Sequence, residues 1–181
     1  MSPRIIALCG PQGSGKTTLA RLLVNQGYEP SRFAGALKTM IHTLLMYQGV
    51  LLEEAVQMTD GDLKETPTPF LDYKTPRHAM QTLGTEWRNL ISKDLWVNIW
   101  ERSLNRDSKI VVDDMRFLHE ADRVHQLGGV VIKIHRPNNL NSDTHSSEQE
   151  YRKIFPDFII TNSSTPNKML IDLNLFLESH Q

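Results

Sequence analysis

Residues 10–17 have the types and the spacing needed to bind the phosphates of a nucleotide. They read Gly-Pro-Gln-Gly-Ser-Gly-Lys-Thr and match the pattern G-x-x-x-x-G-K-[ST], between an apolar run and a stretch with helical spacing. Glycines let the backbone wrap around a phosphate with its N–H groups pointing inward. Lys16 would reach the β- and γ-phosphates, and Thr17 would ligate Mg²⁺. The predicted phosphate-binding residues are Gly10, Gly13, Ser14, Gly15, Lys16, Thr17 and Thr18.

A second candidate segment follows the apolar run at 110–112, where Asp113, Asp114 and Arg116 come in succession. A carboxylate at the end of a buried strand is what positions Mg²⁺ beside a phosphate loop, and either aspartate could do so. We expect Asp113 to hold the metal through water, opposite Thr17. A guanidinium at the same edge can grip a phosphate with two hydrogen bonds. The alternative is a strand-end turn with a surface salt bridge.

A third segment, residues 75–91, has helical periodicity with two distinct faces. A polar stripe suits a phosphate and the edge of a heterocycle, although a solvated helix face would have the same spacing. Gly84 lies in mid-helix, where a close approach of a ligand or a helix would justify its cost of about 1 kcal/mol against alanine. The apolar face consists of Met80, Leu83, Trp87, Leu90 and Ile91. The polar stripe consists of Arg77, Gln81, Thr85 and Arg88.

A polar loop, residues 137–147, follows the apolar run 130–134 and could close over bound phosphates as a lid. Arg136 at its start could stabilise charge on the transferred group. The serines and glutamates at its end also match a helix N-terminal capping signal, so the loop could be a plain connector. The histidines form no H-E-x-x-H motif or Cys/His cluster, so we expect no zinc site.

Continuous apolar runs separated by helical stretches predict a doubly wound α/β sheet, in which ligands bind beyond the carboxyl ends of the strands. The long segment 36–106 interrupts this alternation with mostly helical patterns, and its three tryptophans are expected to be core anchors. We therefore expect one domain with a core of residues 1–35 and 107–181 and a helical insertion at 36–106. The expected strands are 5–9, 31–34 (the weakest), 110–112, 130–134 and 158–160. The expected helices are 16–26, 37–48, 53–58, 78–91, 96–104, 119–127 and 167–178.

The bulk composition narrows the class of protein. The net charge of −1 gives no broad electrostatic footprint for duplex DNA, which argues against nucleic acid as a partner. A single cysteine, Cys9, excludes an internal disulfide and is typical of a reducing cytoplasm. No apolar run approaches the length of a membrane span, and we expect no signal peptide, because the first apolar run begins at Ile5.

Taken together, these motifs resemble the phage-type deoxynucleoside monophosphate kinases over nearly the whole chain. The phosphate loop alone is generic, whereas the run Met-Gln-Thr-Leu-Gly-Thr-Glu-Trp at 80–87 is far more selective. The spacing of Arg77, Gln81 and Gly84 also resembles animal-type phosphomevalonate kinases. Further matching positions are 36–38, 94–97, 112–117, 120–121, Gly129, Arg136, His145, 147–148, Ile160 and Asn162.

The resemblance implies a three-layer P-loop NTPase fold with a helical acceptor-binding insertion. It also implies transfer of the γ-phosphate of ATP, with Mg²⁺, to a deoxynucleoside 5′-monophosphate (dNMP), giving dNDP and ADP. Asn162 would border the adenine, and Lys16, Asp113, Arg116 and Arg136 would serve catalysis. The acceptor side would be lined by Lys38, Arg77, Gln81, Thr85, Arg88 and Arg116.

The sequence leaves undecided which base is accepted, whether ribose is tolerated, and whether the chain forms a homodimer. Only Arg136 lies near the predicted lid, and the next arginine, Arg152, falls on the following helix. Alternative functions are a kinase of modified bases in phage DNA, an ATP-driven DNA-binding module, another small-molecule kinase of the phosphomevalonate type, and a nucleotide-gated binding protein without catalysis.

Overall fold

The apolar run Ile5–Cys9 forms β1, the central strand of a five-stranded parallel sheet with the order β2-β3-β1-β4-β5. All five of its side chains are fully buried, which explains why the run is continuous and does not alternate with polar residues. β1 pairs with β3 through Ile5–Ile110 and with β4 through Ile6–Val130. The strands are β1 (Ile5–Cys9), β2 (Tyr28–Ser31), β3 (Lys109–Val112), β4 (Val130–His135) and β5 (Phe158–Thr161).

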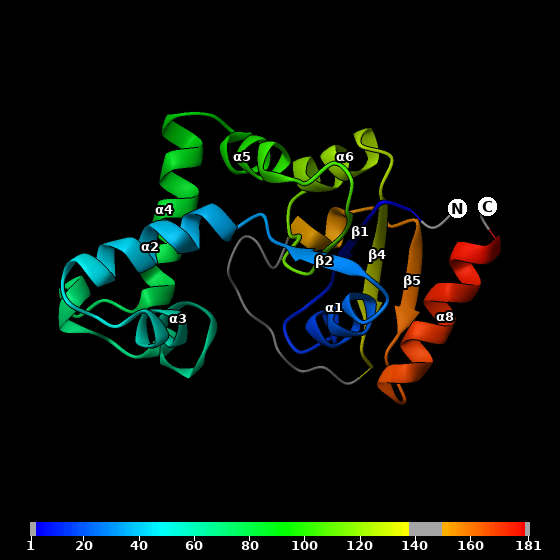
Figure 1. The fold of residues 1–181 in the computed structure, drawn as a ribbon, viewed down its shortest axis with the longest axis horizontal. Helices are drawn as coiled ribbons and strands as arrows, with labels where there is room; N and C mark the ends of the chain where they lie inside the picture. Colours follow the sequence, from blue (N-terminus) through cyan, green and yellow to red (C-terminus); the bar gives the residue numbers. More distant parts are fainter. Residues whose placement is uncertain (1–2, 138–149, 180–181) are drawn as a thin grey trace. The chain divides into compact units, whose positions relative to one another are not determined.

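The computed structural model describes residues 3–137 and 150–179. Its chain divides into a sheet unit, Met1–Phe33 with Leu104–Gln181, and a helical unit, Ala34–Ser103 (Figure 1). The helices and 3₁₀ turns of the sheet unit are α1 (Lys16–Val24), α6 (Leu118–Gln126), η3 (Tyr151–Lys153) and α8 (Pro166–Ser179). Those of the helical unit are α2 (Gly35–Tyr47), α3 (Leu52–Asp60), η1 (Asp62–Glu65), η2 (Pro69–Leu71), α4 (Pro76–Leu90) and α5 (Leu95–Ser103).

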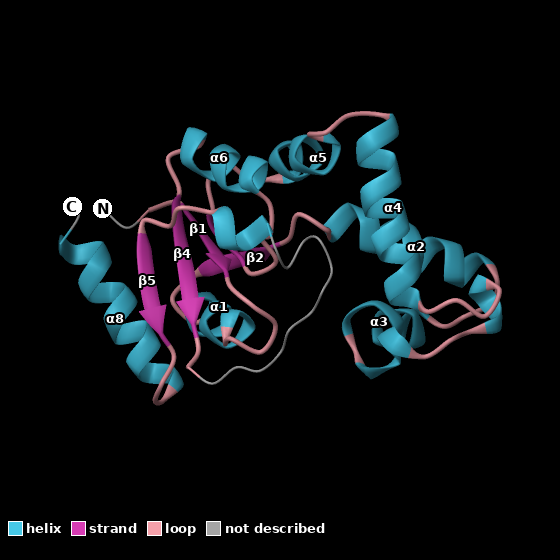
Figure 2. Cartoon of the chain, turned by 180° about the vertical axis from the view of Figure 1, so that it is seen from behind, coloured by secondary structure: helices cyan, strands magenta, loops and turns pink. Residues whose placement is uncertain are grey.

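The sheet unit has three layers, with α1 and α8 on one face of the sheet and α6 on the other (Figure 2). The core on the α1 and α8 face gathers Ile6 and Leu8 of β1 with Leu19, Leu23 and Leu173 of the helices. The predicted α/β fold with a parallel sheet flanked by helices is therefore confirmed.

The predicted second strand was wrong in its bounds. β2 covers Tyr28–Ser31 instead of residues 31–34, and it pairs with β3 at the edge of the sheet. Only Tyr28 in this strand is buried, so no apolar run marks it, whereas Phe33 is buried just beyond its end. An edge strand is specified by its pairing partner more than by its own side chains.

The helical unit has its own core, in which Ile41 and Leu45 of α2 meet Ala55 and Met58 of α3. α2 also lies close to α4, because a Cβ atom added at Gly84 would be 3.0 Å from Leu37. Trp96 of α5 donates a hydrogen bond from Nε1 to the Gly84 carbonyl at 2.9 Å. The mid-helix glycine is thus explained by the close packing of α2.

All three tryptophans of the chain lie in α4 and α5. Trp96 and Trp100 are buried, as expected for core anchors, but Trp87 is 41% exposed and stacks on Trp96 with the ring centroids 6.4 Å apart. The prediction of a core role for Trp87 was therefore wrong. In the part of the chain that the structure describes, no helix is both long and apolar enough to cross a membrane.

Candidate active site

The predicted phosphate loop connects β1 to α1 and is shaped by three glycines with positive φ. Gly10, Gly13 and Gly15 have φ angles of 142°, 75° and 110°, which side-chain-bearing residues rarely adopt. A Cβ atom at Gly10 would lie 2.5 Å from the carbonyl oxygen of Ile134, and one at Gly15 would lie 2.6 Å from Nδ2 of Asn162. Glycine is therefore required at both positions for conformation and for space.

Lys16 begins α1 and bends back over the loop. Its Nζ donates hydrogen bonds to the carbonyl oxygens of Gly10 and Pro11, both at 2.8 Å. The hydroxyl of Ser14 is buried, and it has no hydrogen-bond partner among the described residues. A buried polar atom without a partner is costly, and a phosphate oxygen would satisfy it. The loop thus offers an ammonium group, a hydroxyl and a helix N-terminus to an anion.

Asp113, which follows β3, lies beside the start of α1. Oγ1 of Thr17 donates to Oδ2 of Asp113 at 2.8 Å, and Nε of Arg32 lies 3.4 Å from its Oδ1. Asp114 has a different task, because its Oδ1 accepts a hydrogen bond from the backbone N–H of Phe33 at 3.0 Å. The geometry thus favours Asp113 over Asp114 as the carboxylate that acts together with Thr17.

Thr17 and Asp113 offer oxygen atoms only, which are the ligands that Mg²⁺ prefers. Among the described residues, no group of three or more His, Cys, Asp or Glu side chains could enclose a metal ion. This donor set fits Mg²⁺, which is commonly bound by one or two protein oxygens together with phosphates and water.

A cavity of about 470 Å³ opens beside the loop within the sheet unit. Arg136, just after β4, donates from a guanidinium nitrogen to the Gly13 carbonyl at 3.0 Å. Asn162, just after β5, donates from Nδ2 to the Ser14 carbonyl at 2.8 Å. The ends of β4 and β5 thus hold the loop in shape. The cavity is lined by Gly13, Gly15, Lys16, Thr17, Thr18, Arg136, Asn162, Ser164, Pro166 and Met169.

The side chain of Glu120 in α6 holds the backbone at Arg116 and Phe117 in place. Its Oε2 accepts hydrogen bonds from the N–H groups of Arg116 at 2.7 Å and Phe117 at 3.0 Å. The pKa of Glu120 is raised from 4.5 to about 8, chiefly by burial and to a smaller extent by nearby Asp114, although these hydrogen bonds and the charge of Arg116 act to lower it. The turn after β3 is therefore held by a buried carboxyl group.

The predicted polar stripe of α4 is half-buried in the helical unit, as its four members, Arg77, Gln81, Thr85 and Arg88, are all of intermediate exposure. Arg77 forms an ion pair with Glu65 of η1, and Lys38 of α2 forms one with Asp60 of α3. The apolar positions at the end of α4 are more exposed, with Leu90 at 81% and Ile91 at 60%.

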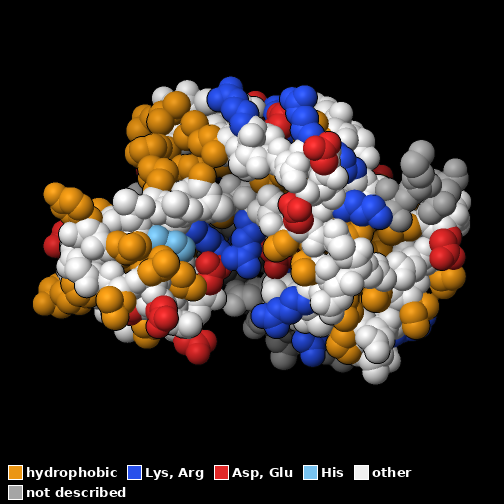
Figure 3. Space-filling model, viewed as in Figure 1, with side chains coloured by type: hydrophobic (Ala, Val, Ile, Leu, Met, Phe, Trp, Pro, Cys, Tyr) orange, Lys and Arg blue, Asp and Glu red, His pale blue; other side chains and the backbone are white. Residues whose placement is uncertain are grey.

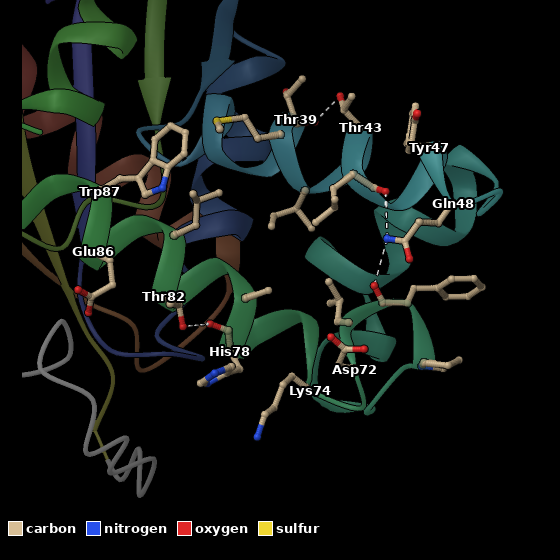
Figure 4. Close-up of a pocket in the computed structure, with 18 residues that line it drawn as sticks. Thr39, Thr43, Tyr47, Gln48, Asp72, Lys74, His78, Thr82, Glu86 and Trp87 are labelled. Carbon is tan, nitrogen blue, oxygen red and sulfur yellow. Dashed lines mark hydrogen bonds between the residues drawn. The ribbon is translucent and has the colours of Figure 1, made fainter. Parts of the chain in front are cut away.

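A second cavity, of about 1100 Å³, lies between α2 and α4 within the helical unit. Figure 4 shows residues that line it, among them Thr39, Thr43 and Tyr47 of α2, Gln48 just after α2, and His78, Thr82, Glu86 and Trp87 of α4. Its lining is mostly apolar and, among the described residues, includes no member of the polar stripe and not Lys38. The half-buried polar stripe and this cavity thus lie on different sides of α4.

Comparison with known proteins identifies the family. The sequence profile of the family "Deoxynucleotide monophosphate kinase" matches residues 70–171. A putative deoxynucleotide monophosphate kinase of Acanthamoeba polyphaga mimivirus is 36% identical over 177 residues, which cover 89% of each chain. The chain belongs to the deoxynucleotide monophosphate kinase family. The kinase therefore has the activity of this family, the phosphorylation of dNMPs, and ATP is its co-substrate.

A solved structure shares the fold of the kinase at low sequence identity. TT1252 from Thermus thermophilus is 16% identical, covers the whole of both chains and superimposes with a TM-score of 0.52. A shikimate kinase from Aquifex aeolicus is 12% identical, covers 97% of each chain and has a TM-score of 0.46.

The structure brings together only part of the predicted set. Thr17, Asp113, Arg136 and Asn162 all lie around the phosphate loop and contact it or its first helix. Nearly all of the predicted lid, residues 137–147, lies outside the described residues.

Sequence reasoning assigned no role to Arg32 or Glu120 of the kinase. For Glu120 a signal was available, because a glutamate three residues after the N-terminal capping residue of a helix, here Phe117, is typical of a residue that accepts hydrogen bonds from the backbone there. For Arg32 the signal was absent, since its contact with Asp113 joins segments that are far apart in the sequence.

Proposed function

We propose that this kinase transfers the γ-phosphate of ATP to the 5′-phosphate of a dNMP, with Mg²⁺ bound at Thr17 and Asp113. The observation that carries the assignment of the donor site is the contact between Thr17 and Asp113 beside a phosphate loop that presents Lys16 and an unpartnered Ser14 hydroxyl. Membership of the family supplies the reaction class, and this arrangement supports the choice of residues.

On the donor side, Lys16 would leave the carbonyl oxygens of Gly10 and Pro11 and bind the β- and γ-phosphates. The backbone N–H groups of the loop and the N-terminus of α1 would bind the remaining phosphate oxygens. Asn162, at the rim of the smaller cavity, would border the adenine. Mg²⁺, when bound, supplies positive charge that neutralises the phosphates.

On the acceptor side, cationic and amide groups would hold the dNMP. An oxygen of its 5′-phosphate attacks the γ-phosphorus, and the bond to the β-phosphate oxygen breaks, so that the electron pair leaves with ADP. Because the transition state spreads negative charge over the transferred group, Arg116 and Arg136 would stabilise it. The proposed acceptor-binding residues are Lys38, Arg77, Gln81, Thr85, Arg88 and Arg116.

The test is an ADP-release assay with ATP and Mg²⁺ against a panel of dNMPs, ribonucleoside monophosphates and oligonucleotides. We expect turnover with at least one dNMP and none with oligonucleotides. Lys16→Ala should lower kcat by a hundredfold or more, on the order of the loss seen when a charge-stabilising donor is removed. Lys153→Ala, the same substitution at an exposed position of η3, is the matched control.

Two outcomes would contradict the proposal. Full activity of Lys16→Ala would remove the phosphate loop from the mechanism. Turnover confined to oligonucleotides would move the acceptor from a free nucleotide to a nucleic acid.

A further inference from the structure

Arg32 lies beside the carboxylate of the proposed metal site, although the proposed reaction gives it no role. It comes directly after β2, whose last residue pairs with the last residue of β3, so that it stands opposite Asp113. Nε of Arg32 is 3.4 Å from Oδ1 of Asp113. At the next position the N–H of Phe33 donates to Oδ1 of Asp114 at 3.0 Å. Two successive contacts thus join the ends of these neighbouring strands.

The two oxygens of the Asp113 carboxylate have different partners. Oδ2 accepts the hydrogen bond from Oγ1 of Thr17 at 2.8 Å, and Oδ1 faces the guanidinium of Arg32. Only 13% of the Asp113 side chain is exposed. A carboxylate with so little access to water needs a cation or a hydrogen-bond donor to offset its lost solvation. Arg32 supplies this positive charge.

Charges further away contribute less to the surroundings of Asp113. On the face that Figure 3 shows, Lys and Arg side chains are interspersed with Asp and Glu side chains over the sheet unit, so that charges of opposite sign offset one another there. Salt also screens exposed charges that are more than about 10 Å apart. The charge at Asp113 is therefore balanced chiefly by the side chains in direct contact with it.

A guanidinium and a divalent metal ion are poor neighbours at a single carboxylate. Both draw on the same two oxygens, and their positive charges repel each other. Arg32 is able to give way, because 39% of its side chain is already exposed. Its guanidinium can turn to solvent without becoming a buried, unpaired charge.

We propose that Arg32 is an internal counter-ion of the metal site and competes with Mg²⁺ for the carboxylate of Asp113. This role of Arg32 rests on the proposed function, which takes Asp113 as the carboxylate that binds the metal. Without nucleotide, Arg32 keeps Asp113 paired and in place beside Thr17. The phosphates of a nucleotide add negative charge that favours the metal over Arg32. Arg32 thus weakens metal binding by itself and makes it depend on the nucleotide.

The test measures how strongly Mg²⁺ tightens the binding of ADP. Isothermal titration calorimetry gives the Kd for ADP in EDTA and in excess Mg²⁺, and the first value divided by the second is the metal effect. In Arg32→Gln we expect the metal effect to be about two- to fivefold larger than in wild type, in keeping with the loss of a partly exposed ion pair. Arg32→Lys keeps the charge and should bring the metal effect back toward the wild-type value.

Two comparisons show whether the change comes from the contact with Asp113. Arg106→Gln, the same substitution in an exposed turn, is the matched control and should leave the metal effect unchanged. In the background of Asp113→Asn, Arg32→Gln should no longer alter the metal effect, because the shared carboxylate is gone. If Arg32→Gln does not fold, Arg32→Met, which keeps most of the apolar stem, takes its place.

The outcomes separate the role of Arg32 from the function on which it rests. An unchanged or smaller metal effect in Arg32→Gln would overturn the competition, since a residue that binds the phosphates or assists the metal would give those results. An increase that persists in the background of Asp113→Asn would also overturn it. If Asp113→Asn alone has the metal effect of wild type, the metal site of the proposed function is wrong.

Discussion

Replacing Glu120 by glutamine should change how the stability of the kinase depends on pH. The Glu120 side chain is only 5% exposed, and it accepts two backbone hydrogen bonds, from Arg116 and Phe117. Burial, the largest influence on this group, raises its pKa from 4.5 to about 8. Glutamine keeps a carbonyl oxygen that can accept the same hydrogen bonds, but it cannot ionise.

The sign of the effect follows from proton binding. Between pH 4.5 and about 8 the folded state holds a proton on Glu120 that the unfolded chain has lost, so rising pH lowers the free energy of unfolding. At most, the equilibrium constant for folding changes about tenfold per pH unit, so the free energy of unfolding changes by up to a few kcal/mol over this interval. This is a sizeable share of the roughly 5–15 kcal/mol that stabilises a typical domain.

The assay is urea unfolding followed by far-ultraviolet circular dichroism at several pH values from 5 to 8.5, at constant ionic strength. Other groups titrate in this range, so the decisive quantity is the unfolding free energy of Glu120→Gln minus that of wild type. This difference should become steadily more favourable to the variant as pH rises. Glu178→Gln, at an exposed position of α8, is the control and should show a constant difference. A difference for Glu120→Gln that stays flat across the range would refute the reasoning.

Three further predictions concern the phosphate loop and its surroundings. Gly15→Ala places a Cβ atom 2.6 Å from Nδ2 of Asn162, at a φ of 110° that alanine rarely adopts. The variant should therefore lose the rise in Tm that ATP causes. Gly35→Ala, whose added Cβ atom would have open space around it, should keep that rise. A normal ATP-induced shift in Gly15→Ala would show that the loop tolerates a side chain. Asp113→Asn removes the charge beside Thr17, so it should lower kcat about a hundredfold and raise the Mg²⁺ concentration needed for half-maximal activity. Asp107→Asn, in an exposed turn, should change neither quantity. An unchanged Mg²⁺ titration of Asp113→Asn would exclude Asp113 from metal binding. Cys9 is buried and burial raises its pKa to about 11, so at pH 8 only about one thiol in a thousand would ionise, and a disulfide reagent should modify it only after unfolding.

What the sequence predicted well is local along the chain. The phosphate loop, β1 and the start of α1 are continuous in sequence, so residue types and spacing alone determine how Lys16 and Thr17 are presented. Predicting that Asp113 lies beside Thr17 needed one more step, the alignment of β3 beside β1 with both carboxyl ends at one edge of the sheet. Parallel pairing of the two strands supplies that alignment.

The features that the sequence did not predict depend on segments that meet only in the folded chain. Arg32 comes directly after β2, and its contact with Asp113 joins the ends of two strands that are far apart in the sequence. Trp87 has the spacing of a core residue, but periodicity reveals which face of a helix it occupies and not whether another element covers that face.

The placement of the tryptophans gives the kinase a built-in optical reporter. Because Trp87, Trp96 and Trp100 all belong to the helical unit, and the sheet unit contains none, intrinsic tryptophan emission originates from one unit only. Partly exposed Trp87 is sensitive to quenchers from solvent, whereas buried Trp96 and Trp100 are shielded. Unlabelled protein can thus report events in the helical unit separately from those at the phosphate loop, and a tryptophan introduced into the sheet unit would add a second, independent signal.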